Sequence, residues 1–172
     1  SFSSGEIGDG RLVEPYLAAL LHEIEACAEM AREMGLHIRV GYIGGGTPSS
    51  LTTPQLDRLL AHVERHFGAL AEFTVEAGRP DTLDAQKLRM LRDHPVTRIS
   101  INPQTMKQAT LDLIGRHHTV DMVKEKFRMA RDLGFDNINM DLIIGLPEED
   151  IDDVRSTMEP VSYTHLRAHE TD

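Results

Sequence analysis

The stretch that decides the fold reads His37-Ile-Arg-Val-Gly-Tyr-Ile-Gly-Gly-Gly-Thr-Pro48. Its first seven residues predict a short strand, which the glycines at 44–46 bring to an end. Apolar side chains recur at helical spacing on both sides of this strand, over 12–34 and again over 53–67. The chain therefore begins with a helix, a strand and a second helix.

This pattern repeats along the chain. Further strands are predicted at 72–76, 98–103 and 137–145, and further helices at 84–92, 107–114, 121–133 and after 150. Strands that alternate with amphipathic helices pair in parallel through helical crossovers, so the fold class is α/β with about four parallel strands. A complete eight-stranded (β/α) barrel needs roughly 250 residues. The 172 residues therefore form either a small open α/β sheet or part of a barrel.

Composition and charge exclude several classes of protein. A formal net charge of −10 argues against nucleic acid as a partner, and no apolar run approaches the length of a membrane span. The polar first residues lack a signal-peptide pattern, so a cytoplasmic location is expected. Cys27 is the only cysteine, which excludes a disulfide framework and any multi-cysteine metal or iron–sulfur site held by this chain alone.

Polar residues and glycines follow the predicted strands at the point where each strand ends. Three glycines at 44–46 leave the backbone open to a ligand, although an isolated glycine run is more often a tight turn. Glu76 ends the second strand, Gln104 follows the third, and Asp141 interrupts the apolar run of the fourth. Since the carboxyl ends of parallel strands share one edge, these side chains are expected to meet there and to form a ligand site.

Other polar residues give weaker signals. His62 and His66 have the i, i+4 spacing of metal ligands, but no third ligand accompanies them in sequence, so a polar helix face is expected and no metal site. Cys27 lies on the apolar side of its helix and is expected to be buried. A set of basic residues near the strand ends could receive an anionic ligand: Arg79, Arg98, Lys107, Arg116, His117 and His118.

Five motifs together resemble one family. They are Gly44-Gly45-Gly46-Thr47-Pro48, Glu76-Ala-Gly-Arg-Pro-Asp-Thr, Ser100-Ile-Asn-Pro-Gln104-Thr-Met, Ile114-Gly-Arg116-His-His-Thr and Asn139-Met-Asp141-Leu-Ile-Ile-Gly-Leu-Pro-Glu-Glu. In this order and spacing they are similar to the radical S-adenosylmethionine (SAM) enzymes of the oxygen-independent coproporphyrinogen III oxidase group, above all its HemZ-type coproporphyrinogen dehydrogenases. The resemblance implies a partial (β/α) TIM-like barrel of the radical SAM type over residues 1–159. Residues 160–172 read as a foreign or disordered tail, with a short native helix as the alternative.

The resemblance also implies a chemistry. In this family a Cys-x-x-x-Cys-x-x-Cys loop after the first strand binds a [4Fe–4S] cluster, which takes an electron from a donor and cleaves SAM. The resulting radical starts the oxidative decarboxylation of coproporphyrinogen III to protoporphyrinogen IX in haem biosynthesis. The substrate would be a porphyrinogen, and the electron donor is not identified. Carried over by motif, the SAM-binding residues would be Gly45, Gly46, Thr47, Glu76, Gln104, Arg116 and Asp141.

One departure from the family pattern bears on activity. The chain opens with Ser1-Phe2-Ser3, where family members read Cys-x-Tyr-Cys-Ser-Phe, so it is expected to start directly after the last cluster cysteine. The chain alone would then hold no cluster and would be inactive. Two alternatives remain open: a haem-chaperone relative of the same superfamily that binds haem, and a small α/β module that binds SAM or another amino acid or nucleoside without a cluster. Unpaired sheet edges also predict that the isolated chain is prone to aggregate or only marginally stable.

Overall fold

Four parallel strands form the sheet of this protein. The computed structural model describes residues 11–166, and within them the strand order is β1-β2-β3-β4. The strands span Val40–Ile43 (β1), Glu72–Glu76 (β2), Arg98–Ser100 (β3) and Ile138–Asn139 (β4), and every neighbouring pair is parallel. The predicted α/β class with about four parallel strands is confirmed.

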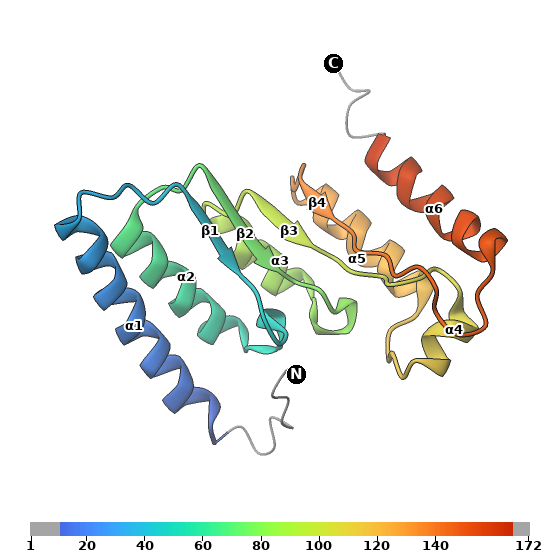
Figure 1. The fold of residues 1–172 in the computed structure, drawn as a ribbon, viewed down its shortest axis with the longest axis horizontal. Helices are drawn as coiled ribbons and strands as arrows, with labels where there is room; N and C mark the ends of the chain where they lie inside the picture. Colours follow the sequence, from blue (N-terminus) through green and yellow to red (C-terminus); the bar gives the residue numbers. More distant parts are fainter. Residues whose placement is uncertain (1–10, 167–172) are drawn as a thin grey trace.

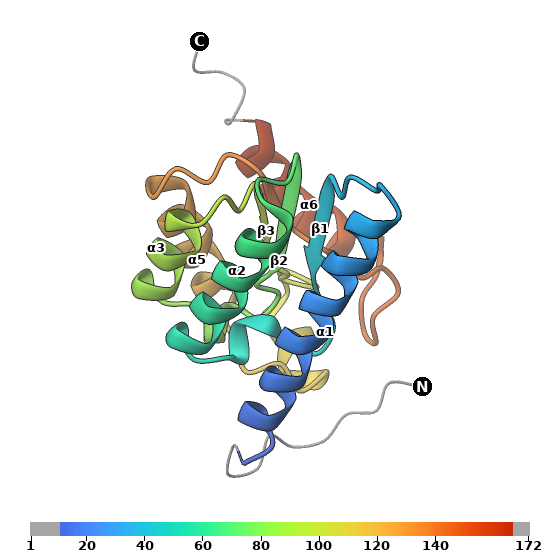
Figure 2. The ribbon, with the colours of Figure 1, turned by 90° about the vertical axis from the view of Figure 1, so that its left-hand side faces the viewer.

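Helices connect the strands and cover one face of the sheet. They span Val13–Glu33 (α1), Thr53–Phe67 (α2), Ala85–Asp93 (α3), Gln108–Leu113 (α4), Val120–Asp132 (α5) and Ile151–Leu166 (α6). Figures 1 and 2 show α1, α2, α3 and α5 in an arc on the same side of the strands. A sheet with helices on one face only is the wall of a barrel, so the structure agrees with a partial barrel and not with a sheet covered on both faces. None of the described helices is both long and apolar enough to cross a membrane.

The hydrophobic core lies between the sheet and this helical arc. Phe73 and Val75 of β2 and Ile99 of β3 are buried beneath the helices. Leu56 and Leu60 of α2 are completely buried, because the apolar residues of this helix recur every three or four positions and face the sheet. The sequence pattern therefore fixes which face of each helix meets which strands.

Short connections at the carboxyl ends of β1 and β2 each contain a single 3₁₀ turn, Pro48–Ser50 (η1) and Pro80–Thr82 (η2). After η1, Thr52 caps α2: its hydroxyl accepts a hydrogen bond from the Gln55 N–H, and the Gln55 side chain accepts one from the Thr52 N–H. These reciprocal bonds form a capping box at the start of α2.

The third and fourth strands are shorter than predicted, and the cause is local. Pro103 has no N–H to donate, so the regular ladder between β3 and β4 stops before it. The N–H of Asp141 bonds instead to the side chain of Asn102 at 3.2 Å. An isolated parallel bridge between Gln104 and Leu142 resumes the pairing beyond this break.

The last helix crosses the expected boundary of the tail. α6 runs to Leu166, so residues 160–166 are helical, while the assignment of residues 160–172 to a foreign or disordered tail stays a prediction. Thr157 and Val161 are both buried, one turn apart, which gives this helix an inward face across the expected boundary. Residues 167–172 lie outside the described part of the chain, and so do residues 1–10 at the other end.

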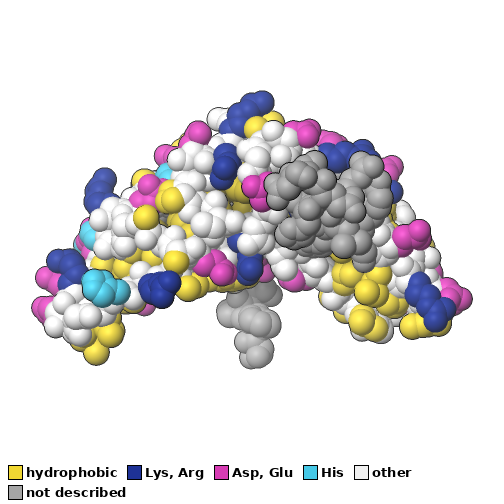
Figure 3. All heavy atoms as spheres, turned by 90° about the horizontal axis from the view of Figure 1, so that it is seen from above, with side chains coloured by type: hydrophobic (Ala, Val, Ile, Leu, Met, Phe, Trp, Pro, Cys, Tyr) yellow, Lys and Arg dark blue, Asp and Glu magenta, His cyan; other side chains and the backbone are white. Residues whose placement is uncertain are grey.

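Both edges of the sheet leave apolar side chains exposed. On the edge strand β1, Val40 is 61% and Tyr42 is 65% exposed. Ile143 and Ile144 are exposed beyond β4, at the other edge. Seen from above, the molecule is an arch with hydrophobic side chains along much of its lower, concave side (Figure 3). This is the surface that a partial barrel leaves open.

Candidate SAM site at the carboxyl ends of the strands

The glycine loop after β1 and the end of β2 meet directly. The N–H of Gly45 donates a hydrogen bond to Glu76 Oε2 at 3.2 Å. Gly45 and Gly46 have φ angles of +80° and +54°, in the left-handed region that favours glycine. A Cβ on Gly44 would stand 3.0 Å from the same Glu76 oxygen and 2.2 Å from Tyr42 Cε1. The loop is therefore shaped by the absence of side chains, and its backbone lies open beside a carboxylate.

A second pair of polar residues joins the ends of β3 and β4. Asn102 Nδ2 donates to Asp141 Oδ2 at 2.9 Å, while the Asp141 N–H donates to Asn102 Oδ1 at 3.2 Å. Asn139 Nδ2 donates to the other Asp141 oxygen at 2.7 Å. Asp141 was expected inside a strand, but it lies two residues beyond β4 and is exposed. Its carboxylate is thus oriented by two amides and still open to a ligand.

Tyr42 links these two pairs, and the sequence analysis missed it. Burial raises the pKa of the Tyr42 hydroxyl, and the negative charges of Glu76 and Asp141 raise it further. Glu76 at the end of β2 and Asp141 in the segment after β4 therefore both act on Tyr42. The alternation of exposed Val40 and Tyr42 with half-buried Gly41 and Ile43 could have placed Tyr42 on the open face.

Lys87 ties together the loops behind the site, and no sequence pattern singled it out. Its Nζ, on α3, donates to the backbone carbonyl of Ser49 at 2.5 Å and to that of Thr82 at 3.2 Å. Ser49 Oγ and Thr82 Oγ1 are themselves 2.5 Å apart. Burial lowers the pKa of Lys87, and Asp84 acts in the opposite direction. Lys87 is a positioning residue that holds the connections after β1 and β2 in register.

Two further predicted residues lie at the same edge, with less contact to the others. Gln104 has a φ of +67°; its N–H donates to the Asp141 carbonyl at 3.1 Å, and its carbonyl accepts from Ile143 at 2.9 Å. Thr47 is half-buried, and its carbonyl accepts a hydrogen bond from Ser50 Oγ at 2.6 Å. The backbone of Gln104 therefore fixes the course of the chain around Asp141.

Arg116 lies apart from this group. It follows α4, and within residues 11–166 no hydrogen bond or ion pair joins it to Gln104 or Asp141. Its neighbour His118 is buried and contacts the Pro103 carbonyl at 3.3 Å, which anchors the loop against the end of β3. Burial lowers the pKa of His118. The structure thus puts Arg116 near the edge without bringing it into the cluster.

The other basic residues do not form an anion site. Arg79 makes two hydrogen bonds to Asp81, and Lys107 is 2.7 Å from Asp153. Arg98 is 3.1 Å from Glu72, at the start of the strands and so at the opposite end of the sheet. Three members of the basic set therefore neutralise acids of their own chain.

Comparison with known proteins assigns the chain to a family. The family model described as Radical SAM superfamily matches residues 14–161. The chain belongs to the radical SAM superfamily.

Two similar relatives carry different names. The chain is 42% identical over 154 residues to the oxygen-independent coproporphyrinogen-III oxidase-like protein HemZ of Bacillus subtilis, covering 88% of this chain and 31% of that protein. It is 41% identical over 138 residues to the heme chaperone HemW of the same organism, covering 78% of this chain and 36% of that protein. The chain thus spans about a third of the length of these relatives.

A solved structure gives the same family. The coproporphyrinogen III oxidase HemN of Escherichia coli, described as a radical SAM enzyme, superimposes with a TM-score of 0.81 at 28% identity. The superposition covers 91% of this chain and 36% of HemN. The expected radical SAM partial barrel is therefore confirmed as the fold of this chain.

The two groups that a radical SAM protein implies fit this chain differently. The backbone at Gly45 and Gly46, where a Cβ would meet nothing within 4 Å, lies open and suits the amino-acid end of SAM. An iron–sulfur cluster needs several cysteine thiolates. The chain has only Cys27, which is exposed on α1 and not buried as expected, so its residues do not fit a cluster.

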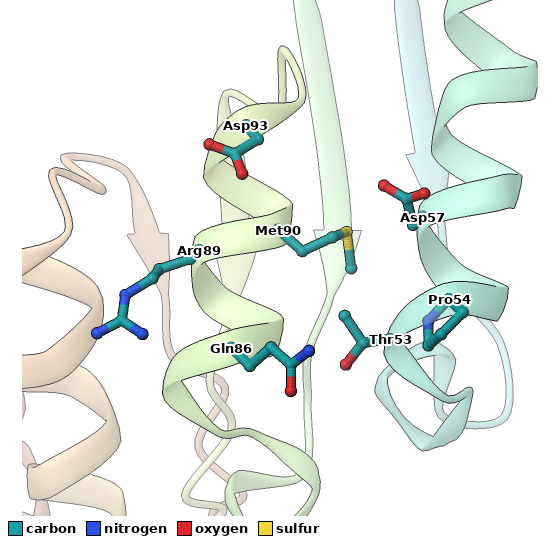
Figure 4. A pocket seen from close by; sticks show the side chains of 7 residues that line it. All are labelled: Thr53, Pro54, Asp57, Gln86, Arg89, Met90 and Asp93. Carbon is teal, nitrogen blue, oxygen red and sulfur yellow. The ribbon is translucent and has the colours of Figure 1, made fainter.

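Among the described residues, another surface hollow lies between α2 and α3 (Figure 4). Asp57, Arg89 and Met90 line it, and Arg89 points away toward α5. Because these residues lie on the helical layer, the hollow is not part of the candidate SAM site at the carboxyl ends of the strands.

Proposed function

We propose that this chain binds SAM at the carboxyl edge of its sheet, as part of a radical SAM enzyme. The observation that carries the proposal is the side-chain-free Gly44–Gly46 loop bonded to Glu76 through the Gly45 N–H. Such a loop presents main-chain groups and a carboxylate to one small ligand. The superfamily membership of residues 14–161 supports SAM as that ligand.

The charges at the edge suit the charges of SAM. SAM carries an ammonium, a sulfonium and a carboxylate, and the charges of Glu76 and Asp141 both act on Tyr42 at this edge. In the proposed mode the backbone of Gly45, Gly46 and Thr47 and the Glu76 carboxylate hold the amino-acid end of SAM. A carboxylate accepts from vicinal hydroxyls, so Asp141 would take the ribose, with the help of Gln104.

Arg116 would complete this arrangement as the partner of the SAM carboxylate, because a guanidinium binds carboxylates through two parallel hydrogen bonds. Since no hydrogen bond or ion pair joins Arg116 to Gln104 or Asp141 within residues 11–166, the proposal requires its side chain to turn toward the ligand. We therefore expect substitution of Arg116 to lower SAM affinity less than substitution of Glu76 does.

The whole protein's reaction is a further step of the proposal. We infer an oxygen-independent coproporphyrinogen III oxidase that decarboxylates a porphyrinogen, with the cluster ligands supplied from outside these 172 residues and an unidentified electron donor. The HemZ and HemN likenesses favour this function. The heme chaperone function is the second candidate, because the HemW identity is within 1% of the HemZ identity.

Calorimetric titration of SAM into the 172-residue chain tests the binding proposal. Glu76→Gln keeps an acceptor for the Gly45 N–H and removes the charge, so SAM affinity should fall about three- to thirtyfold. Glu72→Gln makes the same change at the other end of β2 and should leave affinity unchanged. Equal affinity for the wild type and Glu76→Gln would exclude Glu76 as the SAM partner.

The two candidate activities are separated in the full-length protein that contains this chain. Coproporphyrinogen III turnover under anaerobic conditions supports the oxidase, and stoichiometric haem binding without turnover supports the chaperone. Because both activities involve the same fold, only this comparison distinguishes them.

A further inference from the structure

We propose that Glu25, His62 and His66 form a Zn²⁺ site that fastens α1 to α2. Glu25 lies on α1, whereas His62 and His66 lie one turn apart on α2. One ligand atom from each residue falls within 4.8 Å of the other two, and they form the only such group of three among the described residues. The sequence shows the histidine pair, and the packing of the two helices adds the carboxylate.

The distances fit a tetrahedral ion. The Nε2 atoms of His62 and His66 lie 3.5 and 3.7 Å from the same oxygen, Glu25 Oε1. Ligands at about 2.0–2.1 Å from a tetrahedral Zn²⁺ are about 3.3 Å apart. The two imidazole rings are 4.4 Å apart between centroids and inclined by 44°. Small side-chain adjustments would therefore bring all three atoms onto one ion.

Burial gives a second, independent observation. Among the described residues His66 Nε2 is buried without a hydrogen-bond partner, although a buried polar nitrogen is normally satisfied. The exposed fractions of the His62 and His66 side chains are 12% and 20%, while Glu25 is 47% exposed. A metal ion would satisfy the unpartnered nitrogen, and the exposed carboxylate side gives it a route of entry.

The chemistry of the ligand set selects the ion. Two imidazoles and one carboxylate are ligands that Zn²⁺ accepts, and with three protein ligands the fourth position holds water. His62 Nε2 contacts the Leu21 carbonyl at 3.0 Å in the ion-free arrangement. Coordination through Nε2 would replace this hydrogen bond and leave the ring proton on Nδ1.

The location points to a structural role. His66 is in the last turn of α2, just before β2 begins at Glu72, so the site lies at the amino ends of the strands, away from the proposed SAM site. Near the other end of the same helix pair, Glu14 bonds to Gln55 and Arg58. Zn²⁺ would therefore fix α1 on α2 at a second point, where the hydrogen bond between His62 and the Leu21 carbonyl joins the two helices in the ion-free arrangement.

Competition with a chromogenic chelator tests the proposal on the 172-residue chain, prepared without a histidine tag. We expect one Zn²⁺ per chain, and at least about tenfold weaker binding for His62→Gln, His66→Gln and Glu25→Gln. Two control variants should bind Zn²⁺ as the wild type does. His37→Gln removes an exposed histidine elsewhere, and Cys27→Ser removes the nearby thiol.

A measurement on the wild type keeps the test independent of the folding of the variants. Zn²⁺ should protect His62 and His66, but not His37, from modification by diethyl pyrocarbonate, as mapped by mass spectrometry. Wild-type binding that the Cys27→Ser change abolishes, or equal modification of His66 with and without Zn²⁺, would overturn the assignment.

Discussion

The pair Asn102–Asp141 gives the sharpest prediction from the structure. Asn102→Asp replaces the Nδ2 donor, 2.9 Å from Asp141 Oδ2, by a carboxylate oxygen. Near neutral pH two negative charges then face each other with no donor between them. Asn102 is only 5% exposed, so its side chain cannot turn into solvent without disturbing the end of β3. We expect the variant to be less stable and to bind SAM more weakly.

The size of the effect follows from these contacts. Loss of a hydrogen bond to a charged group costs about 1.5–3 kcal/mol. Repulsion between two charges about 4 Å apart is about 4 kcal/mol near a protein surface, and the exposure of Asp141 to water reduces it. Together the free energy of unfolding should fall by about 2–5 kcal/mol. Asn102→Leu, which adds no charge, should lose about 1–3 kcal/mol.

The pH dependence separates charge from shape. Mutual repulsion raises the pKa of the carboxyl pair in the folded state above the unfolded value. The folded state then binds more protons than the unfolded state, so the Asn102→Asp variant loses stability as pH rises from about 4 to about 7. Near pH 4 a protonated carboxyl can donate a hydrogen bond to its neighbour. The free energy of unfolding of Asn102→Asp should then no longer be lower than that of Asn102→Leu.

Urea unfolding followed by circular dichroism, at low protein concentration and at both pH values, measures this difference. Asn137→Asp is the matched control, because Asn137 Oδ1 accepts from Arg98 Nε at 3.3 Å and a carboxylate there faces a cation. That control should keep its stability at neutral pH. If Asn102→Asp is as stable as the control at neutral pH, or if its deficit does not change with pH, the described pairing of Asn102 with Asp141 is wrong.

Three more predictions rest on other contacts. Lys87→Met leaves two loop carbonyls without their donor, so we expect about 1–3 kcal/mol less stability in urea unfolding and weaker SAM binding in calorimetry. Burial acts to lower the pKa of His94, but its hydrogen bonds with Asp57 and Glu64 raise it overall. Its contribution is therefore present below about pH 6.5 and lost at higher pH, and the stability gap between wild type and His94→Gln should shrink over that range in thermal melts. Val40→Lys places a charge on the exposed edge strand and should reduce concentration-dependent self-association in light scattering, and an unchanged scattering signal would argue against this edge as the contact.

The strands and helices were predictable because each carries its own periodic signal. The apolar spacing of α2 and the glycines after β1 place both elements within a few residues of their observed bounds. The predictions failed where a single residue interrupts the regular backbone pairing. Pro103 shortens β3 and β4 because it cannot donate, and periodicity carries no information about that missing bond.

The sequence predicted which edge of the sheet holds the candidate site, but not every residue that contributes to it. Parallel pairing places the carboxyl ends of all the strands at one edge of the sheet, so Glu76 and Asp141 could be assigned to that edge in advance. Lys87 could not, because its relevance comes from a contact with a loop far away in sequence, at the 38-residue separation of Lys87 and Ser49. Whether these residues bind SAM stays a prediction.

The histidine pair on α2 shows that sequence can reveal part of a candidate metal site and miss the rest. The spacing of His62 and His66 is visible in sequence, and a third ligand is not, because Glu25 belongs to another helix. Its position depends on the register between α1 and α2, which the Glu14–Arg58 ion pair at 2.7 Å and the buried Leu17 set together. A shift of one residue along α1 would rotate Glu25 by about 100° and remove it from both rings. The proposed zinc site therefore depends on helix packing, and a change in that packing should weaken metal binding even with all three ligands present.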